Sequence, residues 1–123
     1  MKRDRSTLDL FRDFEPKPVV RRFADEDVRA WNRERRLSRV VAKTLDAAEG
    51  DREAGARAMS EWLGENVSKA MIDNYASQEK EHQISALRLI ALVAVTGDDR
   101  ALHDLLAEVG LIALDREYEA LLR

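Results

Sequence analysis

Apolar residues recur at helical spacing along most of the chain after residue 25. The first such run begins behind Asp25, which fits an N-cap, and continues to Gly50. Glu26 and Asp27 favour the positive end of a helix dipole. The apolar face of the run consists of Val28, Trp31, Val40, Val41, Thr44, Leu45 and Ala48. This spacing predicts one long helix over about residues 26–49.

Four shorter helical runs follow, each bounded by residues that cap or end helices. Ser68, Ser85 and Asp98 are typical N-caps, and Gly64 and Gly97 are typical stops. The predicted helices are residues 51–63, 69–76, 86–96 and about 98–109.

The run at 86–96 is apolar nearly all round, which predicts the central core helix. Residues 111–114 fit either a short strand or the lead into a final helix over 115–122, and we favour the helix. The pattern therefore predicts an all-α fold. A compact multi-helix domain is expected over residues 25–123.

Residues 1–24 sustain no helical or strand period, and we expect them to form a flexible, extended arm. Pro16 and Pro18 favour extended backbone around Lys17. A solvated tail needs few apolar residues, yet this segment contains a cluster of them. They are Leu8, Leu10, Phe11, Phe14, Val19, Val20 and Phe23. We expect these side chains to bind a partner on which the arm becomes ordered.

Length and composition narrow the class of protein. The chain has 123 residues, enough for one small domain and an arm. It has no cysteine, which excludes disulfides, thiol nucleophiles and Cys-ligated metal sites. No apolar run approaches the roughly 20 residues that cross a bilayer. We therefore expect a cytoplasmic protein that does not bind membranes.

The net charge of −3 divides unevenly along the chain. Residues 1–43 carry 13 basic and 8 acidic residues, a net charge of +5. Residues 44–123 carry 8 basic and 16 acidic residues, a net charge of −8. A basic arm and helix are therefore attached to an acidic helical body.

The residues offer little for catalysis. His82 and His103 lie 21 residues apart in different predicted elements, without a cysteine or second histidine at ligand spacing, so both are expected at the surface. The five glycines occur singly and form no phosphate-binding loop. We expect no enzyme activity, cofactor or metal.

Residues 57–75 fit a helix-turn-helix hairpin. Such a hairpin needs apolar residues late in its first helix, a small residue at the helix crossing, a turn glycine, an apolar anchor and an apolar inner face. The late apolar residues are Met59 and Leu63, and the small crossing residue is Ser60. The turn glycine is Gly64, the apolar anchor is Val67, and the inner face consists of Ile72 and Tyr75. The turn is about two residues longer than the tightest form. Plain helical packing remains the alternative interpretation.

A DNA-binding hairpin would present the outer face of its second helix to the major groove. Ser68, Lys69, Asn74 and Gln78 lie on that face and suit contacts with phosphates or base edges, whereas Asp73 would repel phosphates. Further phosphate contacts are expected from Arg21, Arg22, Arg33, Arg35, Arg36 and Arg39. Alternatively, the basic helix lies across the acidic body of the same or a second chain and neutralises it.

Three segments carry a resemblance to a known family. They are Met59–Ser77 (MSEWLGENVSKAMIDNYAS), Arg88–Asp98 (RLIALVAVTGD) with Ile84 before it, and Glu108–Ala113 (EVGLIA). From about Ala24 onward the chain resembles small helix-turn-helix proteins encoded in the early region of Mu-like transposable phages and prophages. The resemblance implies a DNA-associated regulatory or transposition-linked role. It places Ser68, Lys69 and Asn74 in the recognition helix.

Two functional hypotheses follow. The first is a phage-derived transcriptional regulator that binds DNA as a homodimer. The second is an interaction adaptor, in which the arm and the acidic body bind RNA polymerase, a transposase or another copy of the chain.

Overall fold

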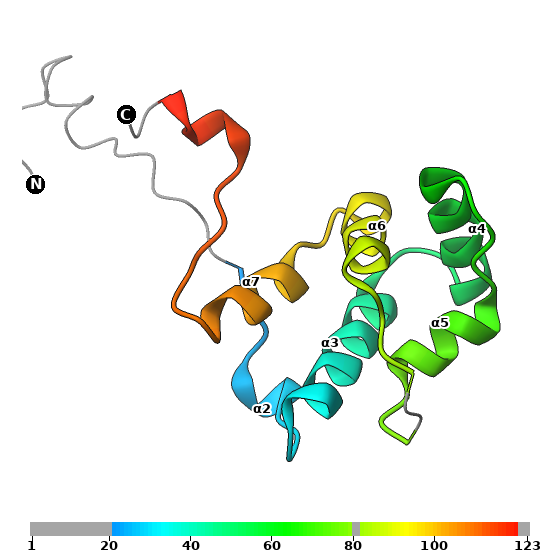
Figure 1. Cartoon of the computed structure of the whole chain (residues 1–123), viewed down its shortest axis with the longest axis horizontal. Helices are drawn as coiled ribbons and strands as arrows, with labels where there is room; N and C mark the ends of the chain where they lie inside the picture. Colours follow the sequence, from blue (N-terminus) through cyan, green and yellow to red (C-terminus); the bar gives the residue numbers. More distant parts are fainter. Residues whose placement is uncertain (1–20, 80–81, 121–123) are drawn as a thin grey trace, which may run out of the picture.

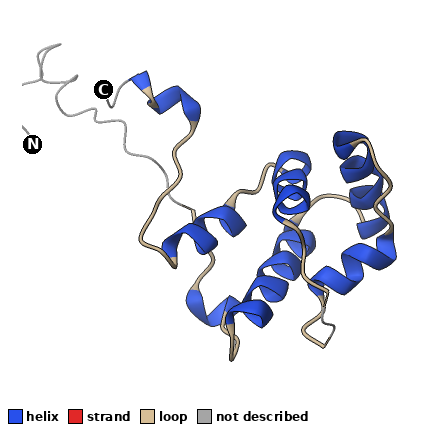
Figure 2. Ribbon diagram, in the orientation of Figure 1, coloured by secondary structure: helices blue, strands red, loops and turns tan. Residues whose placement is uncertain are grey.

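All regular structure in the described part of the chain is helical. The computed structural model describes residues 21–79 and 82–120, and these ranges contain no strand (Figure 2). The helices are α2 (Asp25–Val28), α3 (Arg33–Ala47), α4 (Arg52–Leu63), α5 (Lys69–Ala76), α6 (Ala86–Thr96), α7 (Arg100–Ala107) and a 3₁₀ turn, η1 (Arg116–Tyr118). The predicted all-α class is therefore confirmed. None of these helices has the length and apolar character to span a membrane.

Helix α3 connects the two sides of the domain (Figure 1). It packs against α2 and α7 on one side and against α5 on the other, while α4 packs against α5 and α6. The residues buried between the helices include Val40, Val41, Met59, Ile72 and Leu92. Burying each such side chain stabilises the fold by about 1.5–3 kcal/mol.

Local caps set the bounds of the helices that form the hairpin and follow it. Ser68 Oγ accepts from the amide of Met71 at 3.1 Å, and Ser85 Oγ accepts from that of Arg88 at 3.2 Å. Gly64 ends α4 and Gly97 ends α6, both in the left-handed conformation (φ +75° and +70°) that glycine adopts without strain. Helices α5 and α6 therefore have the bounds that the sequence predicts.

The prediction of one helix over 26–49 is wrong. The backbone leaves α2 at Arg29 in an extended conformation, and α3 begins again after Asn32. The side chain of Asn32 accepts from the amide of Arg35 at 2.8 Å, so this asparagine caps a new helix inside the periodic run. Helix α3 then ends at Ala47.

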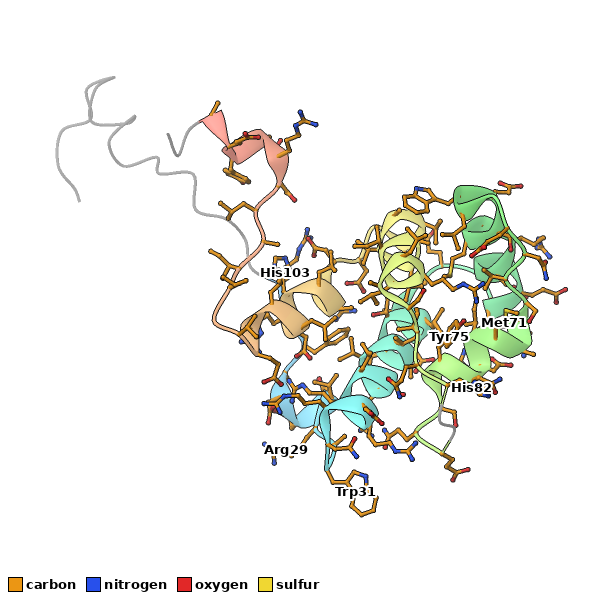
Figure 3. The ribbon with its side chains drawn as sticks, in the orientation of Figure 1. Arg29, Trp31, Met71, Tyr75, His82 and His103 are labelled. Atoms are coloured by element: carbon orange, nitrogen blue, oxygen red, sulfur yellow. The ribbon has the colours of Figure 1, made fainter. Side chains whose placement is uncertain are left out.

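Two residues assigned to that long helix also have other roles. The N-cap of α2 is Ala24 and makes no side-chain cap bond, whereas Asp25 lies within the helix and accepts hydrogen bonds from Arg29 and Arg36. Trp31 lies in the break between α2 and α3 and is 90% exposed. Figure 3 shows its indole pointing away from the domain.

Helix α6 is not the enclosed core helix that its composition predicts. Leu89, Ala91 and Leu92 are buried, but Leu87 is 59% exposed and Ile90 is 40% exposed. One face of α6 thus packs on α4, and its opposite face is open and apolar.

The C-terminal part differs from prediction in three respects. Helix α7 begins after Asp99 rather than Asp98, although Asp98 Oδ1 accepts from the amide of Arg100 at 3.1 Å. His103, expected at the surface, is 3% exposed because it lies on the inner side of α7. The favoured helix over 115–122 is limited to the 3₁₀ turn within the described residues, and 111–114 form no strand.

Most of the predicted arm lies outside the described residues, including Leu8, Leu10, Phe11, Phe14, Val19 and Val20. Phe23 is described. It is 7% exposed and belongs to the core, and the guanidinium of Arg100 lies 4.2 Å from its ring centroid. Phe23 thus contacts its own chain and is not an accessible partner contact.

Candidate nucleic-acid interface

Helices α4 and α5 form a hairpin whose turn is fixed by one side chain. Ser60 Oγ accepts from the amide of Val67 at 2.8 Å and lies 2.7 Å from the carbonyl oxygen of Ala56, to which it donates. Val67 is 2% exposed and fills the space under the turn. The sequence identified Ser60 only as a small residue at the helix crossing. Its hydroxyl also holds the turn against α4.

Asp73 joins the first residues of the two hairpin helices. Its carboxylate accepts from Lys69 Nζ at 2.8 Å and from Arg52 Nη1 at 3.0 Å. The hydrogen bonds from Lys69 and then Arg52 hold the pKa of Asp73 below its usual range. The acidic residue that disfavoured DNA binding in the sequence is therefore neutralised by two cations.

Arg88 ties the turn to α6. Its guanidinium donates to the hydroxyl of Tyr75 at 2.6 Å and to the carboxylate of Glu65 at 3.2 Å, and these two bonds raise its pKa. It also lies 3.6 Å from the sulfur of Met71. Figure 3 shows Met71 and Tyr75 on α5, with His82 in the loop beyond it. Sequence reasoning missed Arg88, because its partners are 13 to 23 residues away.

The four residues predicted to contact DNA from the hairpin differ in accessibility. Lys69 is exposed and Asn74 is half-buried. Gln78 is exposed but does not lie on the outer face of α5 as predicted, because the helix ends at Ala76. The hydroxyl of Ser68, also half-buried, already accepts the capping bond from Met71. Lys69 is consequently the cation that α5 presents at its N-terminal end, beside Arg52 of α4.

Arg36 is committed to the fold. Its side chain is 17% exposed, and its guanidinium donates to both carboxylate oxygens of Asp104 at 2.9 and 2.7 Å and to Asp25 at 2.7 Å. The hydrogen bonds to these carboxylates raise the pKa of Arg36, and the bond to Asp104 has the larger effect. Asp104 is 3% exposed, so this bidentate pair is largely withdrawn from water.

The other predicted phosphate contacts are also near groups of their own chain. Arg39 Nε donates to the carbonyl oxygen of Asp27 at 2.6 Å. Three arginines lie at ion-pair distance from acidic residues in or beside α7: Arg21 with Asp99 at 3.9 Å, Arg22 with Asp104 at 4.0 Å, and Arg33 with Glu108 at 3.9 Å. Arg35 is half-buried in the first turn of α3. The basic segment thus lies against acidic residues of the same chain, as the internal alternative predicts.

The described residues contain no group of three or more His, Cys, Asp or Glu side chains that could hold a metal ion. Comparisons with protein-family models, curated proteins and solved structures give no match to this chain.

Proposed function

We propose that this protein is a non-enzymatic, cytoplasmic DNA-binding regulator that uses the α4–α5 hairpin. The observation that carries the proposal is the cluster of Arg52, Lys69 and Asp73. It brings one cation from the start of each hairpin helix to the same outer surface, where both bind Asp73 and Arg52 also lies 3.6 Å from Asp46. Phosphate recognition requires such cations on a rigid support.

The Ser60 bond and the Arg88 contacts supply that support. They fix the turn between α4 and α5 and leave Lys69 and Ala70 exposed at the N-terminal end of α5. In helix-turn-helix proteins this end of the second helix approaches base edges. The resemblance to Mu-like phage proteins favours control of phage transcription or transposition, with a homodimer reading two half-sites.

Fluorescence anisotropy with labelled promoter DNA, at two salt concentrations, tests the proposal. Binding should weaken steeply with salt, and Lys69→Ala and Arg52→Ala should each reduce the salt slope by about one. Arg35→Ala tests whether α3 adds a phosphate contact. Arg29→Ala, an exposed arginine of the break after α2, is the matched control. Absence of binding at low salt would reject the proposal.

An interaction adaptor is the second candidate. It is favoured by the internal pairing of Arg21, Arg22, Arg33 and Arg36 and by exposed apolar side chains on α6. Deletion of residues 1–20 separates the two candidates and leaves the buried Phe23 in place. Loss of self-association or of RNA polymerase or transposase binding, with DNA affinity retained, would support the adaptor. Retention of partner binding would count against it.

A further inference from the structure

One face of α6 is open and apolar in the described part of the chain. The exposed residues of this helix are Ala86, Leu87, Ile90 and Ala94, and its exposed C-cap, Gly97, continues the same face. Leu87, Ile90, Ala94 and Gly97, here called the α6 row, follow one another at intervals of three, four and three residues. This is the spacing with which one helix packs along another. The spacing therefore favours a helix as the occupant of this face.

The α6 row carries no charged side chain. The only charged residue of α6 is Arg88, and its guanidinium is bonded to Tyr75 and Glu65 in the hairpin. Asp98, which follows the row, accepts from Arg100 at 2.7 Å. Two copies of this face can therefore meet without bringing unpaired charges together. The row does not suit a nucleic acid, because phosphates require cations.

The α6 row is large at one end and small at the other. Leu87 and Ile90 form its N-terminal half, and Ala94 and Gly97 form its C-terminal half. A Cβ atom added at Gly97 would meet no atom within 4 Å, so there is open space at the small end. Two antiparallel copies of the row place each large half against the small half of the other copy, where the side chains can interdigitate. Parallel copies would leave a gap between their small halves.

A two-fold axis generates the antiparallel arrangement from two identical chains. In a two-fold interface, a contact from residue i of one copy to residue j of the other is always repeated in the reverse direction. Opposing the two halves of the row pairs Ile90 with Ala94 and Leu87 with Gly97, each pair twice. The dipoles of the two helices are then antiparallel, which is the favourable orientation.

We propose that the α6 row binds the same row of a second copy of this chain, with Ile90 of each copy against Ala94 of the other. This dimer rests on the proposed function, which requires two copies, and the row specifies how they meet. Helix α6 has 11 residues and is about 16 Å long. A standard stable interface buries about 800 Å² on each partner, which exceeds the area of one short helix pair. We therefore expect a dimer that dissociates readily.

Arg88 connects the α6 row to the DNA-binding hairpin. Its bonds to Tyr75 of α5 and to Glu65 of the turn hold α5 in a fixed position relative to α6. When two α6 helices pack together, the two α5 helices are consequently held at a fixed separation. Recognition of two half-sites requires such a fixed separation.

Disulfide trapping tests the proposal, because the chain has no cysteine of its own. Full-length Ile90→Cys and Ala94→Cys chains are mixed in equal amounts without DNA and oxidised mildly. Mass spectrometry of peptides then measures the 90–90, 94–94 and 90–94 disulfides, which differ in mass. The control is Ala47→Cys, at an exposed alanine that ends α3. Trapping also detects a dimer that dissociates readily.

The 90–94 disulfide should form about tenfold faster than a disulfide between two Ala47→Cys chains, and it should exceed its statistical share of the mixture. A statistical mixture of the three products would overturn the proposal. An excess of the 90–90 and 94–94 products, which parallel helices give, would also overturn it. So would trapping no faster than the control, the result expected if another part of the chain covers this face.

Circular dichroism of the reduced variants checks that they fold. If Ile90→Cys disrupts the fold, Leu87→Cys mixed with Ala94→Cys gives the same test, because these residues also come from opposite halves of the row. The disulfides form without DNA. The α6 interface and DNA binding by the hairpin can therefore fail separately.

Discussion

The hydroxyl of Ser60 in α4 accepts a hydrogen bond at 2.8 Å from the amide of Val67, seven residues later and across the hairpin turn. Replacing Ser60 with alanine leaves that amide unpaired beneath the turn. We expect Ser60→Ala to lower the free energy of unfolding by about 1–3 kcal/mol, measured by urea denaturation. Ser77→Ala removes a hydroxyl that accepts from the exposed amide of Glu79, and it should have a much smaller effect. Equal losses would argue against a special role for Ser60.

Asp73→Asn should strengthen DNA binding if the hairpin contacts phosphates. The substitution keeps the shape of the side chain and removes the negative charge between Lys69 and Arg52. A unit charge at contact distance in water is worth about 1 kcal/mol, so affinity at low salt should rise about fivefold. Anisotropy titration measures the change, and Glu117→Gln, which removes an exposed negative charge in η1, is the control. Weaker binding by Asp73→Asn would contradict a role for these cations in contacting phosphate.

Asp104→Asn should strongly destabilise the domain. It removes the buried charge that pairs with Arg36 and leaves Asp25 as the remaining carboxylate bound to that guanidinium. Breaking a buried ion pair from one side costs about 3–5 kcal/mol, and we expect the lower end because Asp25 remains. Glu108→Gln, at an exposed pair with Arg33, should cost less than about 1 kcal/mol. Urea midpoints of the two variants measure these losses. Equal losses would contradict a stabilising role for the Arg36–Asp104 pair.

Acid should destabilise the fold partly through Asp98. Its hydrogen bonds from the Arg100 side chain hold its pKa below the ordinary value of 3.8. A carboxylate with a lowered folded pKa contributes stability above its unfolded pKa and loses that contribution as the pH falls through the folded pKa. Urea midpoints measured from about pH 6 to about pH 3 should therefore fall, mainly below about pH 4. Asp98→Asn should give a shallower decline, and an unchanged decline would assign the acid sensitivity to other groups.

The proposed homodimer should use the open face of α6. Leu87 and Ile90 are exposed there, one turn apart, on a helix whose only charged residue, Arg88, is bonded to Tyr75 and Glu65. Leu87→Lys and Ile90→Lys should each weaken association by about tenfold or more, measured by light scattering across a dilution series. Val109→Lys, the same kind of aliphatic-to-lysine change at a 71% exposed site beyond α7, should leave it unchanged. Equal weakening by all three variants would place the interface elsewhere.

The sequence predicts best what neighbouring residues decide. Helices α5 and α6 match because Ser68, Ser85 and Gly97 act within one turn of their own positions. The break before α3 is missed because an apolar period continues through Asn32, although an asparagine is itself a frequent cap.

The contacts that build the candidate site are harder to predict because they join distant segments. Nothing in the local sequence of Arg88 indicates Tyr75 and Glu65 as partners, and a helix as apolar as α6 gives no sign of which face lacks a neighbour. The charge asymmetry is visible in the sequence. That the basic and acidic parts pair with each other within one chain is shown by the structure, in which Arg36 binds Asp104.

The position of Arg36 has a consequence for synthesis of the protein. This side chain of α3 holds Asp25 behind it in the chain and Asp104 ahead of it, 68 residues later. Until the ribosome has added Asp104, the guanidinium of Arg36 has Asp25 alone of these two carboxylates. Arg36 of α3 therefore lacks its buried partner until α7 has been synthesised. The N-terminal part of the domain completes its folding only when the chain is nearly finished.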